Sequence, residues 1–400
     1  MVRKLTSSLV LLLLTPFISA QDLQYFTVVD LDSSEPIAYA TVSLASQPER
    51  RTLSNENGGF ILTSVSSMDT LVFSHVSYGQ PRIAVAEILR DTIRLQAKDF
   101  TLDEVAIVSE TGEAILRKVI KASDKNHDFN KTPYFSQSWV TVSNLYDNHL
   151  HAFVEVDGST LWHRRLTKHV FAEVRARSYS WTSLGDAWLK DKTLIDLAWG
   201  WYFVGGGAPY YLFKSPRKAL EAFNVEIEGC YREGKYTVAR LALTSKQSSC
   251  NDSYTLHVDL DSYEVVRFQK HSNLVEYQGI EEYGCPYHYY PDYKVYNHEY
   301  EERFVEIGGN WHRLYLKRAQ QGIYQGEDII TEELNFSQLT EWDASKEKSI
   351  PSSLIARLEM WWTPIDSLQI PWDDSYWQSR PSVPWPDRIA ERLEAEGVAR

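Results

Sequence analysis

The sequence predicts a mainly β protein, with a small β-sandwich followed by a larger, curved antiparallel sheet with covering helices. Short apolar and β-branched runs alternate with turn residues along most of the 400 residues, which is the pattern of β-strands. Helical spacing of apolar residues occurs in only a few places. A composition of 43% hydrophobic and 24% charged residues is ordinary for a folded globular chain, so extensive disorder is excluded.

The first twenty residues, Met1–Ala20, have the pattern of a secretory signal peptide. A cationic start at Arg3 and Lys4 precedes an apolar run over residues 9–14, and the segment ends in a small residue. We expect cleavage before Gln21 and therefore an exported protein. No later apolar run approaches the roughly twenty residues that a membrane helix needs, so we expect no transmembrane helix in the mature chain.

Residues 21–108 are predicted to form the small sandwich. The clearest signal is Ser54–Leu62, where Asn57, Gly58 and Gly59 reverse the chain before an apolar strand begins, because Asn and Gly tolerate positive φ. Short strands with turns about every ten residues are typical of sandwiches. The predicted strands cover residues 23–29, 37–44, 60–65, 71–76, 82–85 and 92–95.

Five segments of this region occur in a characteristic order: Pro36–Val42, Ser54–Phe60, Leu71–Tyr78, Asp91–Leu95 and Leu102–Val108. Together they resemble the carboxypeptidase regulatory-like domain found at the N-termini of TonB-dependent receptors and related bacterial envelope proteins. The resemblance implies a transthyretin-like fold and an accessory, non-catalytic role. One departure is Ser77, where the family usually has glycine before the aromatic residue.

Residues 109–130 are predicted to be a connector helix, because Ile115, Leu116, Val119 and Ile120 recur at helical spacing. Residues 131–346 are predicted to form the large antiparallel region, with a hairpin that turns at Asp259–Ser262. Its predicted strands cover residues 136–142, 149–156, 236–243, 254–260, 264–270, 293–307, 311–318 and 329–336, and the segment 184–223 is expected to supply covering helices.

Residues 347–400 are predicted to be a tail rich in proline and tryptophan that ends in a charged helix over residues 386–396. Its run Pro371–Trp377 and the helix after it are similar to the C-terminal end of larger exported proteins that begin with the regulatory-like domain. This second resemblance implies that the whole chain belongs to such a full-length family.

The net charge limits the kinds of molecule that the protein can bind, and the cysteines limit its possible disulfides. A net charge of −13 disfavours nucleic acid and anionic membrane surfaces, because both demand a basic face. The chain has three cysteines, Cys230, Cys250 and Cys285. Export makes a Cys230–Cys250 disulfide possible, since the two flank predicted neighbouring strands, and three free thiols are the alternative.

One predicted strand carries the main candidate site. Alternation puts His149, His151, Phe153, Glu155 and Asp157 on one face, and histidines with carboxylates are donors that zinc prefers. Polar residues at every second position are also what a solvated strand face contains, and we favour that interpretation over a metal site. His151 and Glu155 are nevertheless candidate binding residues.

A second candidate site lies beside three consecutive glycines, Gly205–Gly207. Trp199 and Trp201 precede them, and aromatic faces next to a mobile loop are suited to line a ligand cavity. An aromatic core under the sheet is the alternative. The glycines form no phosphate-binding loop, because no Lys-Ser or Lys-Thr follows them.

The sequence contains no recognisable reaction motif. There is no Gly-x-Ser-x-Gly, and the pair His298-Glu299 lacks the second histidine of a zincin. We therefore predict no catalytic residue, cofactor or metal, and no tight cluster of ionisable groups enclosed within the larger region.

These observations predict an exported envelope protein of the periplasm or outer membrane whose work is binding or scaffolding. Its partners would be other envelope proteins or a glycan or apolar ligand. Whether it is an enzyme stays open, and the alternative is a hydrolase acting on glycan or peptide with its site near Glu155.

Overall fold

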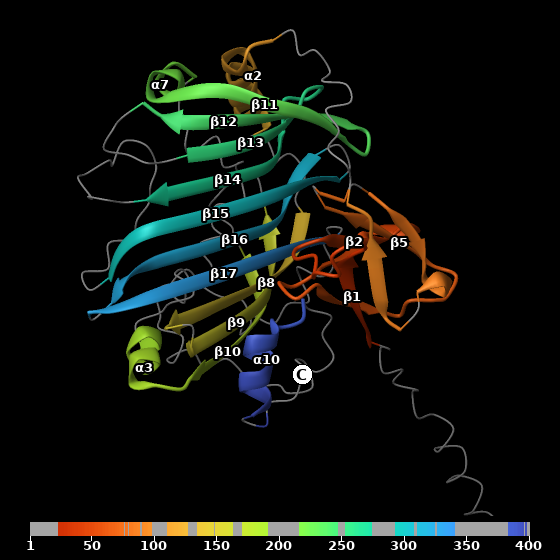
Figure 1. Cartoon of the computed structure of the whole chain (residues 1–400), viewed down its shortest axis with the longest axis vertical. Helices are drawn as coiled ribbons and strands as arrows, with labels where there is room; N and C mark the ends of the chain where they lie inside the picture. The colour runs from red at the N-terminus through yellow and green to blue at the C-terminus, as the bar shows by residue number, and fades with distance from the viewer. Residues whose placement is uncertain are drawn as a thin grey trace, which may run out of the picture.

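The computed structural model describes residues 23–97, 110–126, 134–162, 170–190, 216–246, 253–273, 293–340 and 383–397, apart from a few positions inside these ranges. Over these residues the chain forms two β bodies that lie side by side, a small one from the first strands and a broad one from the later strands (Figure 1). The predicted mainly β fold is therefore confirmed. The predicted signal peptide and residues 347–382 of the tail lie outside the described residues.

The small body is a sandwich of two sheets, with strand orders β4-β1-β7 and β3-β2-β5-β6. Phe26 and Phe60, opposite each other in the first sheet, stack with ring centroids 5.3 Å apart, and Phe73 of the second sheet meets Phe60 edge-on. The predicted sandwich is thus confirmed, and the family resemblance stays a prediction. The strands are β1 (Leu23–Asp30), β2 (Thr41–Leu44), β3 (Gln47–Leu53), β4 (Gly59–Thr63), β5 (Thr70–Ser74), β6 (Arg82–Ala84) and β7 (Thr92–Leu95), with a 3₁₀ turn, η2 (Val85–Glu87), after β6.

The broad body is one ten-stranded sheet with the order β10-β9-β8-β17-β16-β15-β14-β13-β12-β11. Each pair of neighbours is antiparallel. The last strand along the chain, β17, pairs with the first strand of this body, β8. The strands are β8 (Tyr134–Tyr146), β9 (His149–Trp162), β10 (Val170–Ser180), β11 (Phe223–Glu233), β12 (Tyr236–Ser245), β13 (Ser253–Asp259), β14 (Val265–Asn273), β15 (Tyr293–Ile307), β16 (Asn310–Tyr324) and β17 (Glu327–Thr340). The predicted hairpin is confirmed as β13–β14.

The strand register separates the two faces of this sheet. Leu256, Phe268 and Leu316 belong to one row of cross-strand neighbours, whereas Tyr315 and Phe336 belong to the adjacent row. Successive residues of a strand point to opposite faces, so the two rows are on opposite sides of the sheet. We call the side of Leu256 the helix face and the side of Tyr315 the sandwich face.

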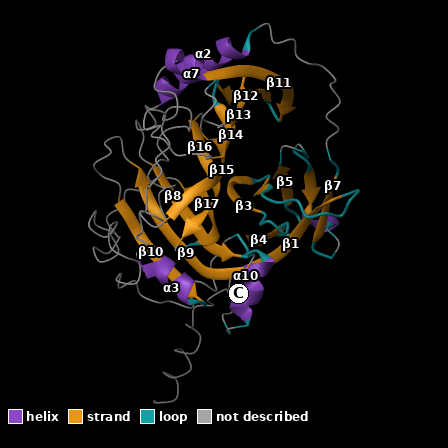
Figure 2. Cartoon of the chain, turned by 60° about the vertical axis from the view of Figure 1, so that its left-hand side comes forward, coloured by secondary structure: helices purple, strands orange, loops and turns teal. Residues whose placement is uncertain are grey.

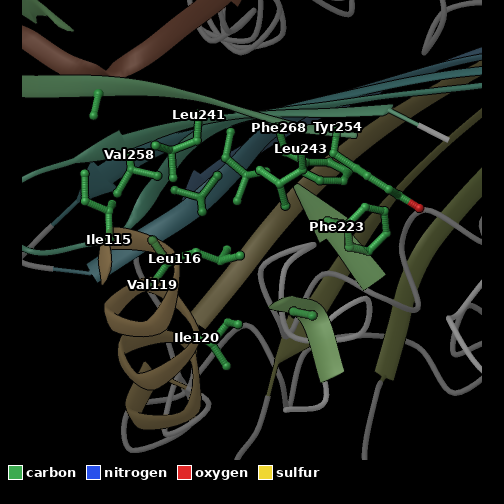
Figure 3. Packing of buried hydrophobic residues seen from close by; sticks show 14 of the residues in the cluster. Ile115, Leu116, Val119, Ile120, Phe223, Leu241, Leu243, Tyr254, Val258 and Phe268 are labelled. Atoms are coloured by element: carbon green, nitrogen blue, oxygen red, sulfur yellow. The ribbon is translucent and has the colours of Figure 1, made fainter. Parts of the chain in front are cut away.

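Two helices cover one end of the helix face. The predicted connector helix is α2 (Gly112–Asn126), which packs beside α7 (Pro216–Ala222). The apolar side of α2, with Ile115 and Val119, lies on Leu241 and Phe268 of the sheet (Figure 3). Burying each such side chain contributes about 1.5–3 kcal/mol, which holds a helix that would be marginal alone.

The third helix, α3 (Ser183–Lys190), contacts β9 and β10. No helix among the described residues is both long enough and apolar enough to cross a membrane.

The sandwich face is covered by the small body and by the C-terminal segment. The predicted terminal helix is α10 (Asp387–Glu394), which lies against β9 near the sandwich (Figure 2). Ile389 and Leu393 of α10 are buried with Leu53 of the sandwich and Phe153 of the sheet in one apolar cluster. This cluster joins three parts of the chain that are far apart in sequence.

The turn of Asn55 connects the sandwich to the C-terminal segment. The Asn55 side chain accepts hydrogen bonds from the amides of Asn57 and Gly59 and donates to the carbonyls of Pro384 and Trp385, at 3.3 and 3.0 Å. Asn57 Oδ1 then accepts a hydrogen bond from the amide of Asp387, at the start of α10. The turn therefore binds a helix as well as reversing the chain.

Gly58 is required in this turn because it has a φ of +76° and a Cβ at that position would lie 2.4 Å from the carbonyl oxygen of Val28. Salt bridges extend the same contact: Arg388 of α10 binds Glu56 of the turn and Glu332 of β17.

We predict that Asn55→Asp lowers the free energy of unfolding by about 2–4 kcal/mol, because the carboxylate loses both donors and faces the carbonyls of Pro384 and Trp385. Urea unfolding and limited proteolysis of the C-terminal segment measure the effect. Asn57→Asp is the matched control, since at that position the structure uses only the side-chain oxygen. Equal stability of the two variants would contradict the role given to Asn55.

Candidate functional site

The predicted strand-face site at Glu155 is a structural contact in the fold. Glu155 is 1% exposed, and its carboxylate accepts hydrogen bonds from the indole of Trp139 and from Arg177, whose Nε and Nη2 lie 2.6 Å from Oε2. The Arg177 guanidinium lies 4.5 Å from the ring centre of Trp385. The expectation of a solvated face here is wrong, because the C-terminal segment covers it.

His151 lies apart from Glu155, near the start of α3. Its Nδ1 is 2.7 Å from Thr182 Oγ1, and burial lowers its pKa, helped by the charge of His149. An irregularity of register between Asn144 and Leu145 interrupts the alternation at this end of the strands. Within the described ranges there is no group of three or more His, Cys, Asp or Glu side chains suited to hold a metal ion.

The predicted tryptophan site and the predicted disulfide lie wholly or partly outside the described residues. Trp199 and Trp201 lie outside the described residues, as does Cys250. Cys230 lies opposite Ala239 of β12 and forms no disulfide with a described residue. The Cys230–Cys250 disulfide therefore stays a prediction.

The helix face encloses a cluster of ionisable groups, which the sequence analysis did not predict. Glu302, 4% exposed, accepts hydrogen bonds from Tyr300 (2.7 Å) and Arg313 (2.9 Å), and Glu333, 2% exposed, pairs with Arg318. The prediction of no enclosed cluster is therefore wrong. Charged residues at alternate positions indicate a solvated face only when nothing covers that face, and here both glutamates are buried.

Burial dominates the electrostatics of this cluster. It raises the pKa of Glu333 above the usual range, against the opposing charges of Arg318 and Arg313. Burial, with the charge of Glu302, also raises the pKa of Tyr300 well above its usual value. Each carboxylate nevertheless has its own guanidinium, which is the arrangement of a neutralised structural network.

A second polar network joins the sandwich to the sheet. His257 is 3% exposed, and its Nδ1 lies 2.9 Å from the hydroxyl of Tyr231. Arg303 of the sheet binds Glu233 of β11 and also Ser74 of the sandwich. Burial, followed by the charges of Arg267, Arg240 and Arg303, lowers the pKa of His257 to about 3. The neighbouring His75 of the sandwich has a pKa of about 4, again chiefly through burial.

An open site formed by described residues lies where three hairpins end. The turns of β11–β12, β13–β14 and β15–β16 meet there at the same end of the sheet, and the middle of α2 completes the wall. The resulting pocket has a volume of about 670 Å³, which is within the range of small-molecule sites. Tyr236 and Trp311, half-buried in its wall, have ring centroids 5.1 Å apart.

Three charged residues of this pocket wall, Lys118, Lys235 and Glu306, are in ion pairs. Lys118 lies 2.5 Å from Glu110 and donates to the hydroxyl of Tyr263, and Lys235 lies 2.6 Å from Glu306. The hydroxyl of Tyr236 also donates to Glu306, at 2.5 Å. The pocket thus combines aromatic faces with fixed donors and acceptors, which suits a polar ligand that has some apolar surface. The sequence analysis did not predict this pocket, because its parts come from four separate segments.

Comparison with known proteins finds no family model that matches the chain and no curated protein that matches it. Among solved structures, similar chains include a DUF1329 family protein from Desulfovibrio piger (9% identity, 60% of this chain and 99% of that one, TM-score 0.25) and a LolA superfamily protein from Nitrosomonas europaea (9%, 62% and 99%, 0.21). A third is Pseudomonas aeruginosa MucB in complex with MucA (7%, 58% and 99%, 0.18). Scores this low assign no family to the chain.

We predict that Glu155→Ala lowers the free energy of unfolding by about 3–5 kcal/mol, because it leaves the buried charge of Arg177 without its partner. Urea unfolding measures the loss, and the double variant with Arg177→Met should recover part of it. The control is Glu228→Ala, which breaks an exposed ion pair with Arg240 and should cost less than about 1 kcal/mol. A loss below that level at Glu155 would contradict the structural role.

The neutral state of His257 predicts a pH dependence of stability. The folded pKa is depressed below the unfolded value, so the unfolded chain takes up the proton first and stability falls as the pH drops below about 6.5. Between pH 7 and pH 5.5 the wild type should lose about 1 kcal/mol more than His257→Asn, which keeps an acceptor for Tyr231.

Urea unfolding at the two pH values measures this difference. His271→Asn is the control, since that imidazole is 45% exposed, and it should lose as much stability as the wild type. The interpretation fails if His257→Asn behaves in the same way as this control.

Proposed function

We propose that this chain is a non-catalytic binding protein of the bacterial envelope that takes its ligand in the pocket at the hairpin ends. The observation that carries the proposal is this open pocket of about 670 Å³, with Tyr236 and Trp311 presented side by side among fixed charges. Aromatic faces with a few oriented polar groups are the usual composition of small-molecule sites. Export is supported by the signal pattern of Met1–Ala20.

The pocket chemistry narrows the ligand class. Its wall contains the lysines Lys118 and Lys235 and the acids Asp259 and Glu306 beside the aromatic rings. An entirely apolar ligand would desolvate these charges without replacing their hydrogen bonds. A polar ligand of the size of one or two sugar rings, or a polar segment of another envelope molecule, fits the proposal better.

A hydrolase is the second candidate, and the observation that favours it is the enclosed Glu333 with its raised pKa, since perturbed carboxyl groups mark many catalytic sites. Two features support binding more strongly. Glu333 and Glu302 are each held by an arginine, and Glu155, where a hydrolytic site was the alternative, is 1% exposed with both oxygens bonded.

The test is a thermal-shift screen of the mature chain from Gln21 with glucose, cellobiose, glucosamine and N-acetylglucosamine oligomers. We expect at least one to raise the melting temperature by about 2 °C at saturation. Trp311→Ala should abolish this shift because it removes an aromatic wall of the pocket. Tyr25→Ala, an exposed aromatic side chain of the sandwich, is the matched control and should keep the shift.

Product analysis of the same mixtures separates the two candidates. No cleavage is expected. Hydrolysis of an oligomer that disappears in Glu333→Gln would replace the binding function with the hydrolase, and a shift that survives Trp311→Ala would remove the pocket from the proposal.

A further inference from the structure

The β13–β14 turn places two acidic residues at the wall of the pocket. The amide of Asp259 donates to the carbonyl of Glu264 at 2.9 Å, so the two residues face each other across the base of the turn. Asp259 lines the pocket, as does Glu264. Their side chains therefore share one local environment.

Asp259 is buried without full compensation. It is 3% exposed, and its Oδ2 accepts hydrogen bonds from the amide (3.1 Å) and the hydroxyl (2.6 Å) of Ser262. Its Oδ1, also buried, has no hydrogen-bond partner among the residues that the structure describes. A buried carboxylate oxygen without a partner is costly, so the site is incomplete as it stands.

Glu264 places a second acidic group beside Asp259. Burial, and then the charge of Asp259, raises the pKa of Glu264 to about 7. Of the three lysines in the pocket wall, Lys118 pairs with Glu110 and Lys235 with Glu306. None of the three, Lys121 included, is among the charges that shift the pKa of Glu264. The acid pair therefore differs from Glu155, Glu302 and Glu333 of the sheet, each of which has a guanidinium.

The aromatic rings belong to the same site. Burial is the main cause of the raised pKa of Tyr236, followed by its hydrogen bond to Glu306, and the charge of Asp259 contributes as well. Asp259 is thus within electrostatic reach of Tyr236, whose ring lies beside that of Trp311. A cation at the acid pair would have aromatic faces nearby, which attract cations in their own right.

A metal ion fits this site less well than an organic cation. Calcium takes six to eight oxygen ligands, whereas the described residues offer no group of three acidic, histidine or cysteine side chains suited to a metal. An ammonium group has three donors, which two carboxylates can satisfy.

We propose that the pocket binds a small molecule through an ammonium group, which lies between Asp259 and Glu264 while the rest of the ligand lies against Tyr236 and Trp311. Two sources share this chemistry, an amino sugar and an alkyl amine. The inference deepens the proposed function and rests on it, since it concerns the same pocket.

Titration calorimetry with four probes tests the inference: glucosamine against glucose, and cadaverine against 1-pentanol. We expect an amine to bind and its neutral counterpart to fail. Asp259→Asn and Glu264→Gln should each weaken amine binding by about tenfold or more. Asp91→Asn, at an exposed acid of the sandwich outside the pocket, should change amine binding by less than about twofold. Asparagine keeps an acceptor for Ser262, and melting temperatures check that every variant is folded.

The pH provides an independent readout. Because burial and the charge of Asp259 raise the pKa of Glu264 to about 7, binding of cadaverine, whose ammonium groups stay protonated in this range, should strengthen between pH 6 and pH 8. Glu264→Gln should remove that dependence. Binding of glucosamine but not cadaverine identifies an amino-sugar site, and the reverse identifies an alkyl-amine site.

Three results would overturn the inference. They are equal binding of the neutral probes, no binding of either amine at about 10 mM, or calcium binding that Asp259→Asn abolishes while the amines do not compete. If the neutral probes bind and Trp311→Ala abolishes their binding, the proposed function stands, but the ligand does not need an ammonium group.

Discussion

The side chain of Asn55 is the contact on which the arrangement of the molecule depends. Its oxygen fixes the turn of the sandwich, and its amide group holds the backbone of Pro384 and Trp385. Trp385 in turn covers Phe153 and Arg177 on the sandwich face. One planar amide thus connects the start of the chain, its end and the broad sheet. The C-terminal segment is also held by the hydrogen bond of Asp387 to Asn57, by the apolar contacts of α10 and Trp385, and by the salt bridges of Arg388.

Covering the sheet on both sides has an electrostatic consequence. The sandwich and the C-terminal segment cover one face, and α2 with α7 covers one end of the other. Charged side chains on both faces are buried, among them Glu155, Glu302 and Glu333. The structure compensates by pairing: Arg177 with Glu155, Arg313 with Glu302, and Arg318 with Glu333. Such pairs add little net stability compared with apolar residues, but losing one partner is expensive. They therefore fix which segments cover which face more than they strengthen the fold.

Local patterns predicted the elements, and long-range contacts decided their surroundings. The turn at Asn57–Gly59, the helix α2 and the β13–β14 hairpin depend on residues close in sequence, so they were predictable. The alternation around Glu155 correctly gave a strand, yet a period of two is the same for a wetted face and for a face covered by a distant segment. Trp385 supplies that cover from 230 residues further along the chain. The pocket was missed for the same reason, since no single segment contains more than a part of it.

The acid pair at the β13–β14 turn, Asp259 and Glu264, contrasts with these paired carboxylates. The fold pairs Glu155, Glu302 and Glu333 with guanidinium groups, and a single substitution nearby to arginine or lysine could do the same for Asp259 and Glu264. The turn itself needs only the Oδ2 contacts of Asp259 with Ser262, which an asparagine would also provide. The negative charge is therefore not explained by the local fold. Departures from local consistency concentrate at functional sites, and this one lies in the wall of an open pocket beside two aromatic rings. A missing cation supplied by a ligand accounts for all three observations together.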